Sequence, residues 1–466
     1  MDFIIFDPNS FISNLPSANN PFSAMFYIIV SGGWILFIPV FIWGFWTGWV
    51  EYIRNKYDEK LEFIVLAIDI PKDNEQTPKA VEHIFSHIYG IKKTGTLVQR
   101  YINGYNQPGI SLEIVSIEGY IQFLIRTPVK FRDLIEAAIY AQYPEAEITE
   151  VEDYVDGIPK PLEYPHEEWD FYGTEYRLVK DELYPIKTYP SFEHSLSQKL
   201  LDPMASLLEI LSRMGPGEQL WLQLVIAPVS GKWRENGIKL INKLIGKKGD
   251  KKKGGDLSYF PREISRGIVE SFTASIVPSS EMGSEKQKTE REWPSMMQHL
   301  SPDEKDIIEA IGMKMSKLGY KSKIRMIYAS KKDAFNKGKG ISAIHGAFQQ
   351  FSTMNFNGIR ENKKTRTKVY YMFKKYRLLA RKRRILWAFR YRSMKRGRKG
   401  FILNTEELAT LWHFPTMDVK APSIQMVDAK KSQPPSELPL ESSVPIPARH
   451  KAITQKGAAP PNLPTG

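Results

Sequence analysis

Cysteine is missing from this chain, and its absence excludes several kinds of chemistry. None of the 466 residues is a cysteine, which rules out disulfide frameworks, thiolate metal sites, iron–sulfur clusters and thiol nucleophiles. The chain also lacks a Gly-x-x-x-x-Gly-Lys-Ser/Thr phosphate loop and a Gly-x-Ser-x-Gly nucleophile elbow. The fragment 337–340 (KGKG) is the nearest approach to a phosphate loop, but it has no leading glycine and no hydroxyl residue. We therefore expect a protein that is not an enzyme, with no catalytic residues and no cofactor.

Charged residues are absent between Asp7 and Glu51. Within this gap, residues 25–50 are apolar and aromatic and are numerous enough to cross roughly 30 Å of hydrocarbon as one helix. The expected interfacial anchors are its tryptophans, Trp34, Trp43, Trp46 and Trp49. No lysine or arginine precedes the stretch, whereas Arg54, Lys56 and Lys60 follow it closely. The positive-inside rule then predicts a single-pass inner-membrane protein with residues 1–24 outside and its body in the cytoplasm.

Hydrophobic periodicity after the expected span indicates an α+β fold. Residues 60–156 are predicted to follow the order βαββαβ, which is the ferredoxin-like split βαβ pattern. The expected strands are 61–71, 110–117, 120–127 and 147–153, and the expected helices are 77–89 and 131–143. Residues 170–352 are predicted to form a second such module, with a strand at 219–228 and a mobile insertion at 247–299. After the insertion, Ser301, Pro302 and Glu304 predict a capping box that begins a helix.

Positive charge is concentrated in one segment. Residues 360–399 hold eighteen lysines and arginines against one acid, Glu361, while the whole chain has a net charge of +13. The rest of the chain is therefore slightly acidic, at 13 − 17 = −4. We expect 360–399 to form a basic amphipathic helical arm, with its long helix over 365–395. The residues expected to make contacts are Arg377, Arg381, Lys382, Arg383, Arg384, Arg390, Arg392, Lys395 and Arg396. Three interpretations of the arm remain open. Its cations and interleaved aromatic residues could bind nucleic acid, or its cations could bind anionic lipid. In the third, the helix packs against the body or binds a protein partner.

Two weaker candidates come from titratable residues. His83 and His87 stand four apart on an expected helix, a spacing that allows a shared metal ion, but no third ligand is evident nearby. A dense acidic stretch covers 145–156, where a solvated strand edge explains the carboxylates as well as a cation or a basic partner would. No metal site is expected from either.

Several motifs resemble an uncharacterised, membrane-anchored domain family of candidate-phyla-radiation bacteria. They are 173–190 (GTEYRLVKDELYPIKTYP), Asp202-Pro203, Gly217-Glu218-Gln219, 347–357 (AFQQFSTMNFN) and, most tellingly, 401–415 with Lys420-Ala421-Pro422. Together they cover most of residues 60–440. In relatives this domain precedes the motor of coupling-protein-type ATPases of type IV secretion or conjugation, or it occurs in similar standalone membrane proteins. Here a segment at 400–421 is followed by a tail, 422–466, that is rich in proline and is expected to be disordered.

The resemblance implies a membrane-anchored scaffold or adaptor of a type IV secretion-like transfer apparatus. Such a chain would bind nucleic acid or a motor ATPase supplied by another chain through its basic arm. Two rivals remain open, a structural membrane protein that docks on lipid and a hydrolase with an unrecognised site. The sequence leaves the cargo, the partner and the formation of a homo-oligomer undecided.

Overall fold

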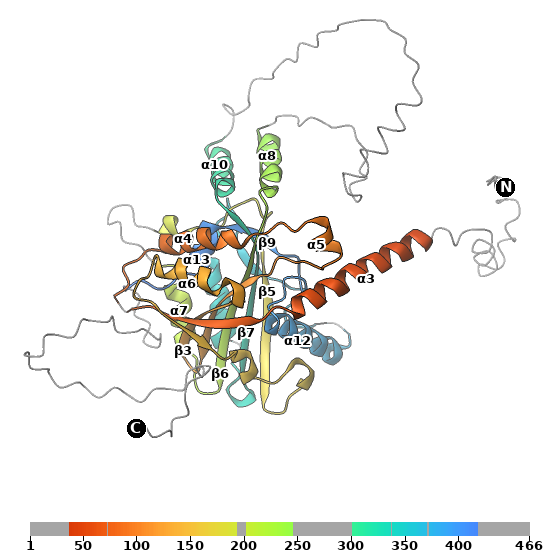
Figure 1. Ribbon diagram of the computed structural model, residues 1–466. Helices are drawn as coiled ribbons and strands as arrows, with labels where there is room; N and C mark the ends of the chain where they lie inside the picture. The colour runs from red at the N-terminus through yellow and green to blue at the C-terminus, as the bar shows by residue number, and fades with distance from the viewer. Residues whose placement is uncertain are drawn as a thin grey trace, which may run out of the picture.

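The computed structural model describes residues 37–417, apart from 72, 193–201, 246–300, 337 and 371. The expected segments 1–24, 247–299 and 422–466 lie outside this part of the chain. The described residues contain nine strands: β1 (Phe63–Asp69), β2 (Ile110–Ile117), β3 (Tyr120–Pro128), β4 (Glu147–Val151), β5 (Trp169–Leu178), β6 (Glu218–Pro228), β7 (Gly319–Lys331), β8 (Ile359–Glu361) and β9 (Phe401–Asn404). All of them belong to one antiparallel sheet, which runs through the body (Figure 1).

The expectation of two separate ferredoxin-like modules was wrong. The strand order is β4-β1-β3-β2-β6-β7-β5-β8, with β9 on β7. The two expected modules meet where β2 pairs with β6, from Ile110 opposite Ile226 to Ile117 opposite Gln219. Seven of the eight residues of β2 are buried, a pattern typical of a strand covered on both faces rather than one at a sheet edge. One continuous sheet satisfies the backbone groups of both strands.

Both faces of this sheet are covered, one by more helices than the other. The first face packs against α4 (Pro78–Ile88), α6 (Arg132–Tyr140), α7 (Ala205–Ser212), α11 (Ala343–Gln349) and α13 (Thr405–Leu411). The second face packs against α12 (Lys374–Arg390) and the segment 154–164. A small third core joins α8 (Trp233–Leu244) to α10 (Pro302–Ser316) at one end of the sheet. α5 (Leu97–Tyr101) is a single capped turn.

The expected membrane span is also corrected. Within the described ranges, no helix combines the length and the apolar character needed to cross a bilayer. α3 (Phe37–Glu59) covers the second half of the expected span, but its last nine residues include five charged side chains, and Val50 and Ile53 are buried. Of the expected anchors, Trp34 lies outside the described residues, while Trp43, Trp46 and Trp49 are about half exposed on α3. The predicted single-pass inner-membrane placement depended on that span and is wrong with it.

Candidate functional site

α12 lies across the second face of the sheet and carries most of the cations expected to make contacts. It is shorter than the predicted helix, because Phe373 before it and Arg392 after it both have left-handed backbones, with φ of 57° and 47°. Leu386 and Phe389 are buried, and the Phe389 ring packs on Trp221 of β6 with centroids 5.6 Å apart. The apolar side of the helix therefore faces the sheet, and its remaining positions meet solvent or flanking segments.

Five of the nine expected contact residues bind other segments of the body instead, and a sixth, Arg381, donates to the carbonyl oxygens of Arg366 and Lys368 just before α12. Arg392 is buried, with its guanidinium 2.9 Å from Glu113 and 2.6 Å from Asp153. The other four make these contacts: Lys382 with Asp170, Arg383 with the carbonyl oxygen of Tyr164, Arg390 with Asp156, and Lys395 with Asp58. Burial alone would raise the pKa of Glu113, but the charge and hydrogen bonds of Arg392 reverse this and lower it. These cations hold the arm against the body.

A row of buried polar side chains crosses four strands beneath α12. Glu113, Gln223, Arg325 and Glu175 lie directly opposite one another on β2, β6, β7 and β5. The amide of Gln223 donates to Glu113 at 3.0 Å, and its oxygen accepts from Arg325 at 3.2 Å. Arg325 in turn donates to Glu175 at 3.1 Å. Each of these polar side chains has a hydrogen-bond partner, so the row is stable inside the protein. Its last member, Glu175, also lines a cleft.

This cleft has a volume of about 620 Å³ and a strongly cationic lining. It lies between α12, the turn after β8 and the turn before β9. Its lining includes five cationic side chains: Lys364, Arg381, Arg384, Arg396 and Arg398. Asn362 and Thr365 add polar groups, and Ile385 and Ala388 add apolar surface. We refer to it as the cationic cleft. Its size is within the range of small-ligand sites.

One acid, Glu175, is among the described residues that line the cationic cleft, and its charge is already used. It pairs with the fully buried Arg325 and also accepts the backbone N–H of Arg398 at 2.8 Å. Gly397 makes this close approach feasible, since a Cβ atom there would come within 2.1 Å of the Glu175 carboxylate and its φ is +89°. The five cations therefore face the cleft without an equivalent number of acids.

The pKa shifts in and around the cleft agree with this uncompensated charge. Partial burial, together with the like charges of Arg377, Arg366 and Arg384, lowers the pKa of Arg381. Burial and the neighbouring Arg325 lower the pKa of Lys323 to about 8. A bound anion would relieve this repulsion.

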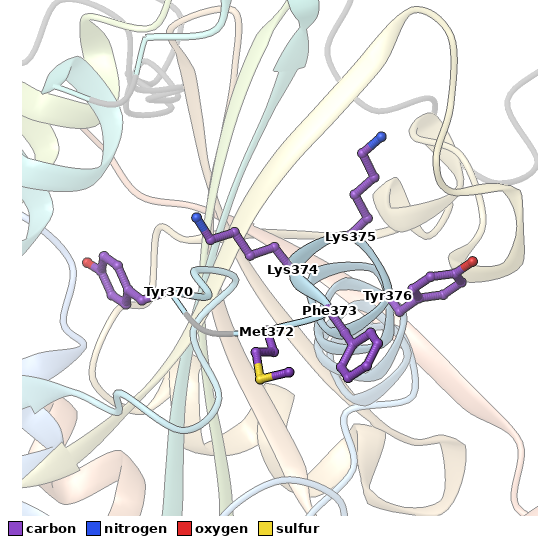
Figure 2. A pocket seen from close by; sticks show the side chains of 6 residues that line it. All are labelled: Tyr370, Met372, Phe373, Lys374, Lys375 and Tyr376. Carbon is purple, nitrogen blue, oxygen red and sulfur yellow. The ribbon is translucent and has the colours of Figure 1, made fainter.

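Exposed aromatic residues stand at the start of α12. Tyr370, Phe373 and Tyr376, which we call the ring cluster, line an open hollow of about 450 Å³ together with Met372, Lys374 and Lys375. In Figure 2 the rings of Phe373 and Tyr376 extend from the first turn of the helix, while Tyr370 lies apart on the preceding segment. Phe373 is 71% and Tyr376 is 78% exposed. Lys368 and Arg366 lie over the Tyr370 ring, at 5.1 and 5.7 Å from its centroid.

Three of the remaining expected contact residues line the cationic cleft, and the fourth is exposed on α12. The three are Arg381, Arg384 and Arg396, with Arg396 stacked 3.7 Å from the Trp387 centroid, and the fourth is Arg377. The sequence interpretation missed Lys364 and Arg398, which lie in turns on either side of the helix. Both are in the basic segment, so composition could have identified them, but the expected contact residues ran only from Arg377 to Arg396.

The weaker candidates are not assembled into a site. His83 and His87 are exposed on α4, and no described group of three or more histidine, aspartate or glutamate side chains could hold a metal ion. In the acidic stretch Glu150, Asp153 and Asp156 pair with arginines. Lys339, from the glycine-rich fragment, pairs with Glu218.

The motif at 401–415 serves the core. Asn404 and Glu407 form a capping box at the start of α13, and Glu407 also pairs with Lys314 at 2.9 Å, both side chains being fully buried. His413 lies 2.9 Å from Asp202 inside the protein. These polar residues join α13 to α10 and to the segment before α7, so structure alone explains why they are polar.

A family model described as "Domain of unknown function (DUF8128)" matches residues 59–426, which covers the sheet, α12 and the cationic cleft. No curated protein matches the chain.

Proposed function

Since the chain belongs to the family described as Domain of unknown function (DUF8128), whose description gives no activity, we propose from the site that the protein binds the phosphate groups of nucleic acid. The observation that carries this proposal is the cationic cleft. Five cations line it, and the carboxylate of Glu175 in the same lining is already paired with Arg325. Guanidinium groups bind phosphate oxygens through paired N–H donors. Several of them on one surface are the electrostatic footprint of a nucleic-acid-binding protein.

The proposed role is binding rather than catalysis. The polar side chains of the lining are cations, an asparagine and a threonine, beside a carboxylate already engaged in an ion pair. Such a lining offers donors to an anion. General acid–base work would need a titratable group within reach of a substrate.

The test measures the anisotropy of fluorescently labelled DNA with the full chain over a range of salt concentrations. Binding should weaken as salt rises, because each phosphate contact releases condensed counterions. Arg384→Gln and Arg398→Gln should each reduce the salt slope by about one and lower the affinity. Lys243→Gln is the matched control, since it removes an exposed cation on α8, away from the cleft. Equal affinities and slopes for all three variants would contradict the proposal.

The sequence resemblance supplies a proposed setting. We infer an adaptor that presents nucleic acid to a coupling-type motor ATPase supplied by another chain. This setting predicts that the two proteins copurify. The Arg384→Gln/Arg398→Gln variant should lose copurification, and an excess of DNA should restore it. Copurification that nuclease treatment and the cleft variant both leave unchanged would indicate a direct protein contact elsewhere.

A further inference from the structure

We propose that the ligand of the cationic cleft is single-stranded nucleic acid, and that the ring cluster at the start of α12 stacks on its bases. This inference rests on the proposed function and adds the class of ligand. A duplex offers its phosphates to the cleft but keeps its base faces inside the stack. A single strand offers both.

The first argument is the exposure of the rings. Phe373 and Tyr376 each expose more than two thirds of their surface, with Met372 beside them at 77%. Within the described part of the chain, no other aromatic ring packs against either residue. Large apolar side chains grouped at one exposed place are uncommon in a monomeric protein and mark surfaces that bind something.

The second argument is the charge around the rings. Lys374 and Lys375 line the same hollow, and Arg366 and Lys368 lie over Tyr370. The occupant must therefore be anionic and must also present flat apolar faces. Unstacked bases on a phosphate backbone have this combination, and base–aromatic stacking tolerates any sequence because every base has a π face.

The third argument is the continuity of the rings with the cleft. Tyr376 of the ring cluster precedes Arg384 of the cleft by eight residues within α12, about 12 Å at a rise of roughly 1.5 Å per residue. One strand can therefore contact the rings and then the cleft. A flat anionic bilayer is the rival occupant, but it would reach the exposed rings more readily than a cleft whose lining includes the buried Glu175 and Ile385.

The experiment uses the full chain and three labelled probes of equal length, about 20 nucleotides, which exceeds the roughly 4–16 nucleotides of typical single-strand sites. The probes are an oligothymidine, an abasic strand with the same number of phosphates, and a duplex. Wild-type protein should bind the oligothymidine at least tenfold more tightly than the abasic strand. Phe373→Ala/Tyr376→Ala should lose this preference and leave duplex binding unchanged. Tyr376→Phe should keep it, as should Tyr140→Ala, which removes an exposed tyrosine from α6.

The outcomes separate this inference from the proposed function. If wild type binds all three probes alike, or the double variant keeps the preference, the inference is overturned, while loss of binding in the cleft variants still supports the proposed function. If no probe binds, both fail. If the double variant instead loses binding to phosphatidylserine vesicles while its preference for oligothymidine persists, the rings belong to a membrane contact and the inference is again overturned.

Discussion

At the scale of single residues, the buried charges matter most for stability. Lys314 and Glu407 are both fully buried, and Glu407 also accepts the backbone N–H groups of Ile186 and Asn404. Arg392 and Arg325 are held in the same way under α12. Burying a charge costs several kcal/mol unless a partner and hydrogen bonds compensate it. Each of these pairs should therefore respond strongly to the loss of one member.

Lys314→Met should lower the free energy of unfolding by about 3–5 kcal/mol, because it leaves the Glu407 carboxylate buried without its partner. Lys314→Met/Glu407→Gln should regain part of this loss, since the amide keeps an acceptor for the backbone donors and has no charge. Urea unfolding of the two single variants and the double variant measures the coupling between them. Simple additivity of the two single changes would contradict the prediction.

Asp69, at the end of β1, should make stability depend on pH. Burial, and secondarily Glu147 opposite it, raises its pKa from 3.8 to about 7. Between these values the folded state keeps a proton that the unfolded chain has released, so the free energy of unfolding falls as pH rises through this window. Asp69→Asn removes the effect. The free energy of unfolding of the variant should exceed that of wild type by up to about 4 kcal/mol at alkaline pH, and by much less near about pH 4. Urea unfolding at both ends of the window tests this, and an equal difference at the two ends would refute it.

At the scale of elements, local signals predicted several pieces of the fold. Ser301 accepts the Glu304 N–H in the expected capping box of α10, and β6 begins one residue before its predicted start. Caps and alternation act within a few residues, so they can be read from sequence. Pairing cannot be read this way, because β2 meets a strand more than a hundred positions away.

The same limit applies to the candidate site. Composition identified the basic segment and therefore Arg381, Arg384 and Arg396. It could not indicate that Arg392 would turn inward to Glu113, 279 positions earlier, or that Arg398 would complete a cleft. Which cations remain available to a ligand depends on tertiary contacts.

The turn before β9 is an element on which the cleft depends. Gly397→Ala should destabilise the protein by about 1–3 kcal/mol, because it places a side chain at positive φ and against the Glu175 carboxylate. It should also weaken DNA binding, since Arg396 and Arg398 move with the turn. Gly231→Ala is the control, as nothing lies within 4 Å of a Cβ atom there and its φ is ordinary. Unfolding and anisotropy measurements on the pair test this, and similar behaviour of the two variants would rule it out.

At the scale of the whole molecule, the shared sheet should make the body unfold as a unit. The long β2–β6 pairing joins the two halves that the sequence interpretation separated, and β6 pairs in turn with β7. Trp221 is fully buried on β6, the strand that both pairings share. Loss of far-ultraviolet circular dichroism and the change in tryptophan fluorescence should therefore have coincident urea midpoints. Two resolved transitions would indicate two independently stable parts.

The β2–β6 junction also limits how this protein can be divided for laboratory work. A fragment ending near residue 156 would keep the complete β2 but lose β6, which pairs with one of its edges. The backbone groups along that edge of eight mostly apolar residues would then be unpaired. Such edges recruit further copies and form insoluble material. A shortened version intended for crystallisation should therefore keep everything from β1 to α13 in one polypeptide and be trimmed only outside those limits.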